Sequence, residues 1–147
     1  YHPITKKRYY ATTVIDIYTR MAHVKIHERM SQKASYDTVM EAQNKFGFIF
    51  KTVQTDNGSE FGKWFRDQLA AHKISYRHTR VRKPNDNAHI ERFNRTLREE
   101  CLGNYLPANE SIHQSQVRTD KWLDYYNHDR LHLGLQLITP IQMLRRC

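Results

Sequence analysis

Two carboxylates, Asp56 and Glu91, have the residue types and positions that divalent-metal chemistry requires. Asp56 directly follows a short β-type run at 52–55, and 34 residues separate it from Glu91, which stands just after a helix start near Ala88. A carboxylate at the end of a strand points out of the sheet edge, where open α/β sheets bind ligands. A few oxygen ligands that leave room for water and phosphate suit Mg²⁺ or Mn²⁺, which support phosphoryl transfer.

Each acid also has a purely structural interpretation. Asp56 belongs to the sequence Asp56-Asn57-Gly58, which is a strong turn signal. A carboxylate in the first turn of a helix is favoured by the helix macrodipole, whatever else it does. Glu91 also stands four residues before Arg95, the spacing of an intrahelical ion pair. The two residue types alone therefore leave both interpretations open.

The helix that carries Glu91 has two different faces. At about 100° per residue, one stripe is apolar and contains Ile90, Phe93, Leu97 and Cys101. A second stripe contains Glu91, Asn94, Arg95 and Arg98. Guanidinium groups beside a metal-type carboxylate supply positive charge for phosphates without competing for the metal. The pattern predicts that one face packs on a sheet while the other meets a phosphodiester backbone.

Positive charge is concentrated in the same part of the chain. Lys and Arg number 24 against 15 Asp and Glu, a net charge of +9, and the span from Lys73 to Arg98 holds eight basic residues against two acidic ones. Such a cluster indicates a polyanionic partner, first of all nucleic acid. In the loop before the helix, we expect DNA contacts from Arg80, Arg82 and Lys83. A solvated basic surface is the alternative that charge alone does not exclude.

The elements that position these residues alternate between strands and helices. We expect strands at 8–16, 21–27, 52–55 and 74–79, and helices at 31–46, 61–72, from 88 onward, at 112–127 and after Pro140. Ser31 or Ser35 can cap the first helix, and Asp86 or Asn87 the third. This order predicts an α/β layer fold with a twisted sheet covered on both faces.

Length and composition limit the class of protein. A chain of 147 residues with 39% hydrophobic residues fits one domain with a real core. No apolar run approaches the roughly 20 residues of a membrane span. The two cysteines, Cys101 and Cys147, form no CxxC pair, which argues against a disulfide scaffold or a zinc ribbon and favours a reducing, intracellular compartment. Because Tyr1 is not a natural start, we expect a piece of a longer protein.

Two motifs in order resemble a known catalytic core. The segment VQTDNGSEF at 53–61, followed by AHIERFNRTLREE at 88–100, closely resembles the core of retroviral integrases and bacterial insertion-sequence transposases. The ending YYNHDRLHLGLQLITPIQML at 125–144 resembles the YN-x-x-R-x-H…TP tail of the transposases. The resemblance covers nearly the whole chain. It implies one catalytic core domain over 1–147, with a helical tail from about residue 111. It implies an RNase H-like fold, in which a mixed twisted sheet is flanked by helices on both faces.

The same resemblance implies an activity. Members of this superfamily are polynucleotidyl transferases that cleave a DNA strand with water and join it through a DNA 3′-hydroxyl, at a DDE site that uses Mg²⁺ or Mn²⁺. By motif match, Asp56 and Glu91 are the second and third metal-binding acids, and Asn94, Arg95 and Arg98 face DNA. The implied partners are element ends, target DNA and further copies of the chain in a dimer or larger assembly. The implied location is the bacterial cytoplasm, in association with the nucleoid.

The chain departs from the family pattern in two places. The family's first acid lies on a strand ahead of 8–16, whereas Asp16 matches a position that is not a metal ligand. We therefore expect the first catalytic Asp just before Tyr1, with Asp16 as the less favoured substitute, and expect this piece alone to hold metal poorly. The family's Asn-Gly before the catalytic helix is Asn87-Ala88 here, which restricts the backbone.

Two alternatives to a transposase remain open. A DNA-binding remnant would keep the basic surface without the chemistry. An RNase H-like nuclease would cut DNA without joining it.

Overall fold

The computed structural model describes residues 6–80 and 83–147. Strands β1 (Tyr10–Ile15) and β2 (Ala22–His27) pair antiparallel, and strands β3 (Thr52–Thr55) and β4 (Ser75–His78) pair parallel. The helices are α1 (Gln32–Phe46), α2 (Lys63–Ala71), α3 (Ala88–Leu97), α4 (Ile112–His128) and α5 (Pro140–Leu144). The predicted alternation of strands and helices is therefore confirmed.

The described strands form two separate two-stranded sheets, where a single mixed sheet was expected. Among the described strands, β1 pairs only with β2, and β3 only with β4. Val14 of β1 and Val53 of β3 nevertheless pack against the same hydrophobic cluster, built from Val39, Phe65, Leu69 and Ile74. Side chains of α1 and α2 therefore join the two sheets, without the backbone ladder that requires neighbouring strands about 4.8 Å apart.

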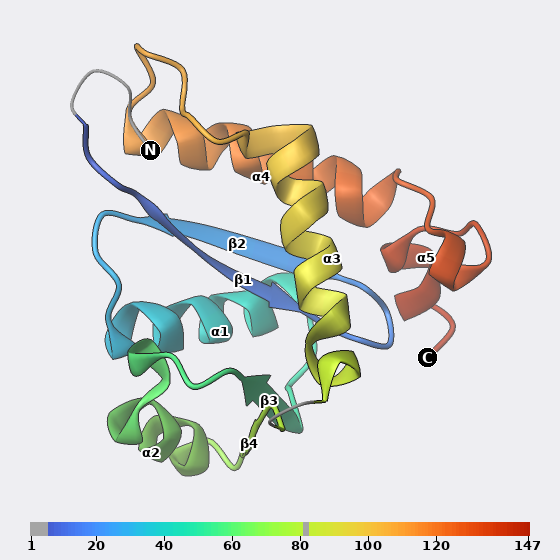
Figure 1. Ribbon diagram of the computed structural model, residues 1–147. Helices are drawn as coiled ribbons and strands as arrows, with labels where there is room; N and C mark the ends of the chain where they lie inside the picture. The colour runs from blue at the N-terminus through green and yellow to red at the C-terminus, as the bar shows by residue number, and fades with distance from the viewer. Residues whose placement is uncertain (1–5, 81–82) are drawn as a thin grey trace.

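Helices cover both faces of the β1–β2 sheet, as predicted. Met21 packs with Ala42 and Phe46 of α1 on one face. Ala22 and Val24 point to the other face, because neighbouring residues of a strand alternate in direction, and there they contact α3 and α4. Figure 1 shows β1 and β2 between α1 and α4, with α2, β3 and β4 farther from α4.

Local sequence signals account for the ends of the first two helices. The Ser31 hydroxyl accepts a hydrogen bond from the Ala34 backbone N–H at 3.0 Å, so Ser31 is the cap of α1. Gly47, with φ of 82°, ends that helix in the left-handed conformation. The helix expected at 61–72 is instead a 3₁₀ turn over Ser59–Phe61 followed by α2, because Gly62 between them has an extended backbone, with ψ of −164°.

The approach to α3 also differs from the predicted loop. A 3₁₀ turn over Pro84–Asn87 leads into the helix, and the Asn87 side chain makes no capping bond. The side chain of the other predicted cap, Asp86, lies outside the described part of the structure. Ala88 has φ of −62° and ψ of −37°, which any residue adopts in a helix, so the backbone at this position does not need the family's glycine.

Asn127 ties α4 to the sheet. Its Oδ1 accepts a hydrogen bond from the Ala22 N–H, and its Nδ2 donates one to the Ala22 carbonyl, both at 2.9 Å. Asn127 is only 8% exposed. The amide therefore satisfies both backbone groups of Ala22 at the place where α4 crosses β2.

Replacing Asn127 by Ala should destabilise the protein by about 2 kcal/mol or more, because a buried donor and a buried acceptor lose their partners. Urea unfolding of both proteins measures this difference. Lys121→Ala is the matched control, since Lys121 is exposed on the same helix and should change stability by no more than about 0.5 kcal/mol. Equal losses for the two variants would contradict this role of Asn127.

Candidate metal and DNA-binding site

Asp56 directly follows β3 and is exposed. Its Oδ1 accepts a hydrogen bond from the Gly58 N–H at 2.9 Å, so the predicted turn is present. Its Oδ2 has no hydrogen-bond partner among the described residues. The carboxylate thus closes the turn with one oxygen and can offer the other to a ligand.

Side-chain hydrogen bonds connect the ends of β3 and β4 beside Asp56. The Tyr76 hydroxyl lies 2.5 Å from Thr55 Oγ1 and 3.1 Å from His78 Nδ1. The Tyr76 ring packs against Phe65 of α2 at a centroid distance of 6.2 Å. Thr55 Oγ1 also lies 3.0 Å from the Asp56 carbonyl oxygen and can donate to it. The backbone that carries Asp56 is therefore anchored to β4 and α2.

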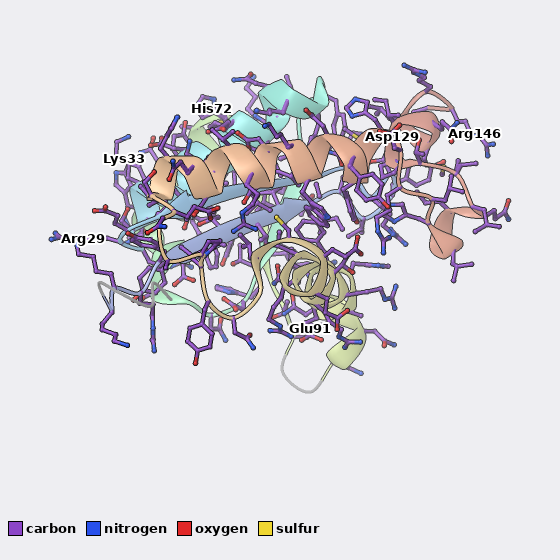
Figure 2. The ribbon with its side chains drawn as sticks, turned by 90° about the horizontal axis from the view of Figure 1, so that it is seen from above. Arg29, Lys33, His72, Glu91, Asp129 and Arg146 are labelled. Carbon is purple, nitrogen blue, oxygen red and sulfur yellow. The ribbon has the colours of Figure 1, made fainter. Side chains whose placement is uncertain are left out.

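Glu91 lies in the first turn of α3 and is exposed. Figure 2 shows α3 nearly end on, with Glu91 on its outer side, away from β1 and β2. Glu91 and Arg95 form no ion pair in the structure, so the intrahelical-pair interpretation of this spacing is wrong here. No residue in 6–80 or 83–147 pairs with the Glu91 carboxylate, so these parts of the chain leave it open to an external ligand.

The apolar stripe of α3 fixes the rotation of the helix, as predicted. Phe93 and Leu97 are buried at 2% and 4% exposure, and Ile90 and Cys101 pack beside them. The Phe93 ring meets the Tyr126 ring edge to face, with a centroid distance of 5.1 Å and an interplanar angle of 77°. Because this face is held by α4 and β2, the Glu91 face must point outward.

The predicted DNA-facing side chains lie on that outer side. Asn94, Arg95 and Arg98 are exposed and make no side-chain hydrogen bond or ion pair among the described residues. After Leu97 the helix continues as a π-helical turn over Arg98–Leu102, which Gly103 ends with φ of 65°. Arg80 and Lys83 are exposed on the approach to α3, and Arg82 lies outside the described residues.

Asp16 has a structural role in the turn between β1 and β2. Its Oδ2 accepts hydrogen bonds from the Thr19 N–H at 2.8 Å and from Thr19 Oγ1 at 2.7 Å. In the described ranges, no group of three or more His, Cys, Asp or Glu side chains is placed to hold a metal ion. Asp16 therefore does not complete a three-acid cluster with Asp56 and Glu91.

Two basic residues that the sequence pattern did not single out, Arg20 and His89, have lowered pKa values in the folded protein. Arg20 lies in the β1–β2 turn, and His89 and Arg92 lie on α3. Burial lowers the pKa of Arg20, and the nearby Arg92 lowers it further, while Tyr126 and Asp16 act in the opposite direction. Burial likewise lowers the pKa of His89, and both arginines add to this effect.

The fold agrees with the sequence comparisons. Two family profiles described as Integrase core domain match residues 1–84 and 72–140. The chain therefore belongs to the integrase core domain family, which includes insertion-sequence transposases and retroviral integrase catalytic cores. In the described residues, no helix is long and apolar enough to cross a membrane.

Curated relatives include bacterial and viral proteins. The transposase for insertion sequence element IS904 of Lactococcus lactis is 28% identical, with 95% of this chain and 56% of the relative covered. The candidate integrase ORF3 of Spiroplasma virus SpV1-C74 is 30% identical, with 94% of this chain and 42% of the relative covered. The chain thus spans about half the length of the curated relatives it matches.

A solved structure shares the fold. The catalytic core domain of HTLV-2 integrase, in complex with magnesium and in a trimeric form, superposes with a TM-score of 0.72 at 17% identity. The match covers 97% of this chain and 88% of that one. The mixed α/β architecture is therefore that of integrase catalytic cores, which are RNase H-like, although its strands here form two small sheets.

Proposed function

We propose that this chain is the catalytic core of an insertion-sequence transposase that cleaves and joins DNA strands at a divalent-metal site. The observation that carries the proposal is the exposed Glu91, which pairs with no described residue, on the same helix surface as Asn94, Arg95 and Arg98. This surface offers a carboxylate ligand and phosphate-binding charge on one rigid element. The relatives named as transposases support the same reaction.

The carboxylates of Asp56 and Glu91 suit a hard cation, which prefers oxygen ligands. Asp56 Oδ2 and the Glu91 carboxylate are exposed oxygen ligands without partners in the described structure, and Mg²⁺ or Mn²⁺ takes such ligands together with water and phosphate oxygens. When bound, the metal would supply charge for the attacking and leaving oxygens of phosphoryl transfer. The chain's own contribution is to hold two carboxylates on anchored elements and to bind the phosphodiester with Arg95, Arg98 and Lys83.

The third acid belongs, in this proposal, to a strand ahead of Tyr1. Among the described strands, β1 pairs only with β2 and β3 only with β4, so one backbone edge of β1 and one of β3 have no strand partner. Side chains of both strands pack on one hydrophobic cluster. Unpaired backbone groups at a sheet edge are open to a further strand. The absence of a three-acid group among the described residues supports an acid other than Asp16 as the third ligand.

Strand joining also requires that two DNA ends meet, so we propose that the full-length protein acts as a dimer or larger assembly. Element ends and target DNA are its partners, and the bacterial nucleoid is its place of action. The relatives from bacterial insertion elements support this setting.

Product analysis of the full-length protein on DNA ends of its own element, with Mn²⁺, tests the proposal. The transposase predicts covalently joined strands in addition to cleaved ones. Cleaved strands without any joined product would instead identify the nuclease. Tight, salt-sensitive binding without any product would identify the DNA-binding remnant.

A further inference from the structure

Three short polar contacts form one connected series from His78 to the backbone of Asp56. His78 Nδ1 lies 3.1 Å from the Tyr76 hydroxyl, which in turn lies 2.5 Å from Thr55 Oγ1. Thr55 Oγ1 lies 3.0 Å from the Asp56 carbonyl oxygen. Tyr76 and His78 stand two residues apart on β4, so their side chains share one face of the strand. The series therefore runs from β4 across to the end of β3.

Only one placement of the hydrogen atoms puts a hydrogen into all three contacts. The Asp56 carbonyl can only accept, so Thr55 must donate its single hydroxyl hydrogen to it. Tyr76 must then donate to Thr55, and His78 must carry a hydrogen on Nδ1 and donate it to Tyr76. In the opposite direction, with Tyr76 donating to His78, two oxygens would stay in contact without a hydrogen between them. The geometry therefore favours donation toward Asp56.

Ring contacts hold the middle of this series in place. The His78 ring stands edge-on to the half-buried Tyr76 ring, with a centroid distance of 4.8 Å and an interplanar angle of 85°. The guanidinium carbon of Arg66 on α2 lies 5.8 Å from the Tyr76 ring centroid. A positive charge near the ring favours the negative charge that builds up on the hydroxyl oxygen when it shares its hydrogen. Arg66 therefore strengthens Tyr76 as a donor.

The bond to the Asp56 carbonyl also affects the Asp56 carboxylate. The planar peptide group between Asp56 and Asn57 lies inside the turn that the carboxylate closes, where Oδ1 is 2.9 Å from the Gly58 nitrogen. A hydrogen bond from Thr55 limits the rotation of this peptide group, and with it the position of Gly58 relative to Asp56. The direction of the second carboxylate oxygen, Oδ2, is restricted as a result.

We propose that Tyr76 and His78 are positioning residues of the candidate metal site. Together with Thr55 they form a hydrogen-bond relay, directed from His78 Nδ1 to the Asp56 carbonyl, that sets the direction of the Asp56 carboxylate. This inference rests on the proposed function and deepens it with two residues outside the catalytic motifs. Both residues act on the carboxylate through Thr55, so they should influence the rate of strand joining without changing DNA affinity.

Nitrogen NMR of the metal-free, full-length protein with ¹⁵N-labelled histidine tests the direction of the relay. In the neutral His78 ring of the wild type, we expect the hydrogen on Nδ1, and we expect Tyr76→Phe to remove this preference. The His78 signals are assigned by their loss in His78→Asn. An Nδ1 without hydrogen would overturn the inference, as would the same preference in Tyr76→Phe. The measurement needs neither metal nor DNA, so it decides on the relay even if the protein joins no DNA.

Strand joining by the full-length protein tests the effect of the relay on the site. Tyr76→Phe removes only the hydroxyl and should slow joining about tenfold or more, the usual effect of losing an outer-shell partner. His78→Phe keeps a ring against Tyr76 without a donor and should slow joining as much. His78→Asn offers an amide N–H in place of Nδ1–H and should restore most of the rate. Combining Tyr76→Phe with His78→Phe should cost no more than either change alone, because one missing link interrupts the relay.

A second tyrosine–histidine pair provides the matched control. The Tyr36 hydroxyl lies 2.6 Å from His72 Nε2, between α1 and the end of α2. Figure 2 shows His72 far from Glu91. Tyr36→Phe removes the same kind of hydrogen bond away from the candidate site, so joining by this variant should equal that of the wild type.

Thermal unfolding of each variant shows whether slower joining follows from lower stability. If Tyr76→Phe is unstable, the two changes at the exposed His78 decide. Wild-type joining by Tyr76→Phe, or equal losses in His78→Asn and His78→Phe, would overturn the inference. Joining that depends on Glu91 but not on Tyr76 would leave the transposase proposal standing and remove only the relay.

Discussion

Replacing Glu91 by Gln in the full-length protein should reduce DNA strand joining by at least about a hundredfold while leaving DNA affinity almost unchanged. Losing even an outer-shell partner of a metal site costs 10- to 100-fold, so the loss of a proposed ligand should cost at least as much. Gln keeps the size and polarity of Glu but lacks its charge. Because Glu91 is exposed and forms no ion pair with any residue that the structure describes, the fold should not change.

The matched control for Glu91→Gln is Glu99→Gln. Glu99 is an exposed acid one residue after Arg98, so its replacement makes the same change of charge near the same proposed DNA-binding surface. Joining by Glu99→Gln should stay close to that of the wild type. If both variants lose joining equally, net charge and not metal binding explains the effect.

Phe93→Ala should destabilise the chain by about 3–5 kcal/mol, the usual cost of removing a buried aromatic ring. The ring is 2% exposed and contacts Tyr126 and Trp122, with centroid distances of 5.1 and 6.0 Å. It holds α3 against α4, so its loss frees the helix that carries Glu91. The free energy of unfolding of a small domain is only about 5–15 kcal/mol, so this substitution should remove a large share of it.

Urea unfolding followed by circular dichroism measures the loss for Phe93→Ala. Asn94→Ala is the control on the neighbouring position, where the side chain is exposed and the change should stay within about 0.5 kcal/mol. A difference below about 1 kcal/mol between the two variants would show that the α3–α4 contact does not hold the helix in place.

The local structure around the two candidate acids could be predicted from the sequence because strong local signals surround them. The turn at Asp56 follows from the Asp-Asn-Gly sequence, and the outward direction of Glu91 follows from the apolar stripe of Phe93 and Leu97. Both features depend on neighbours within a few residues. Helical periodicity and turn chemistry therefore suffice to place them.

Features that depend on distant partners were not predictable in this way. The double hydrogen bond between Asn127 and Ala22 joins residues 105 positions apart, and nothing around either residue signals it. The division into two small sheets depends on which backbone edges meet, and strand patterns alone do not specify that.

The resemblance of the C-terminal tail to transposases now has a physical basis in several of its residues. Asn127 holds β2, Arg130 is paired with Glu100, and Thr139 caps α5 through its hydroxyl and Gln142. His132 lies perpendicular to the Tyr126 ring at a centroid distance of 4.7 Å. These contacts secure α4 and α5 to the rest of the fold, so the motif has a role in positioning these elements.

The central claim is that Asp56 and Glu91 hold the same divalent cation. Replacing that cation by Fe²⁺ in the full-length protein, then adding ascorbate and peroxide, cleaves the backbone close to the bound iron. Cuts near residues 56 and 91, suppressed by excess Mg²⁺ and lost in Asp56→Asn and in Glu91→Gln, are the predicted result. Cuts at other positions, or the same cuts in both variants, would contradict the account.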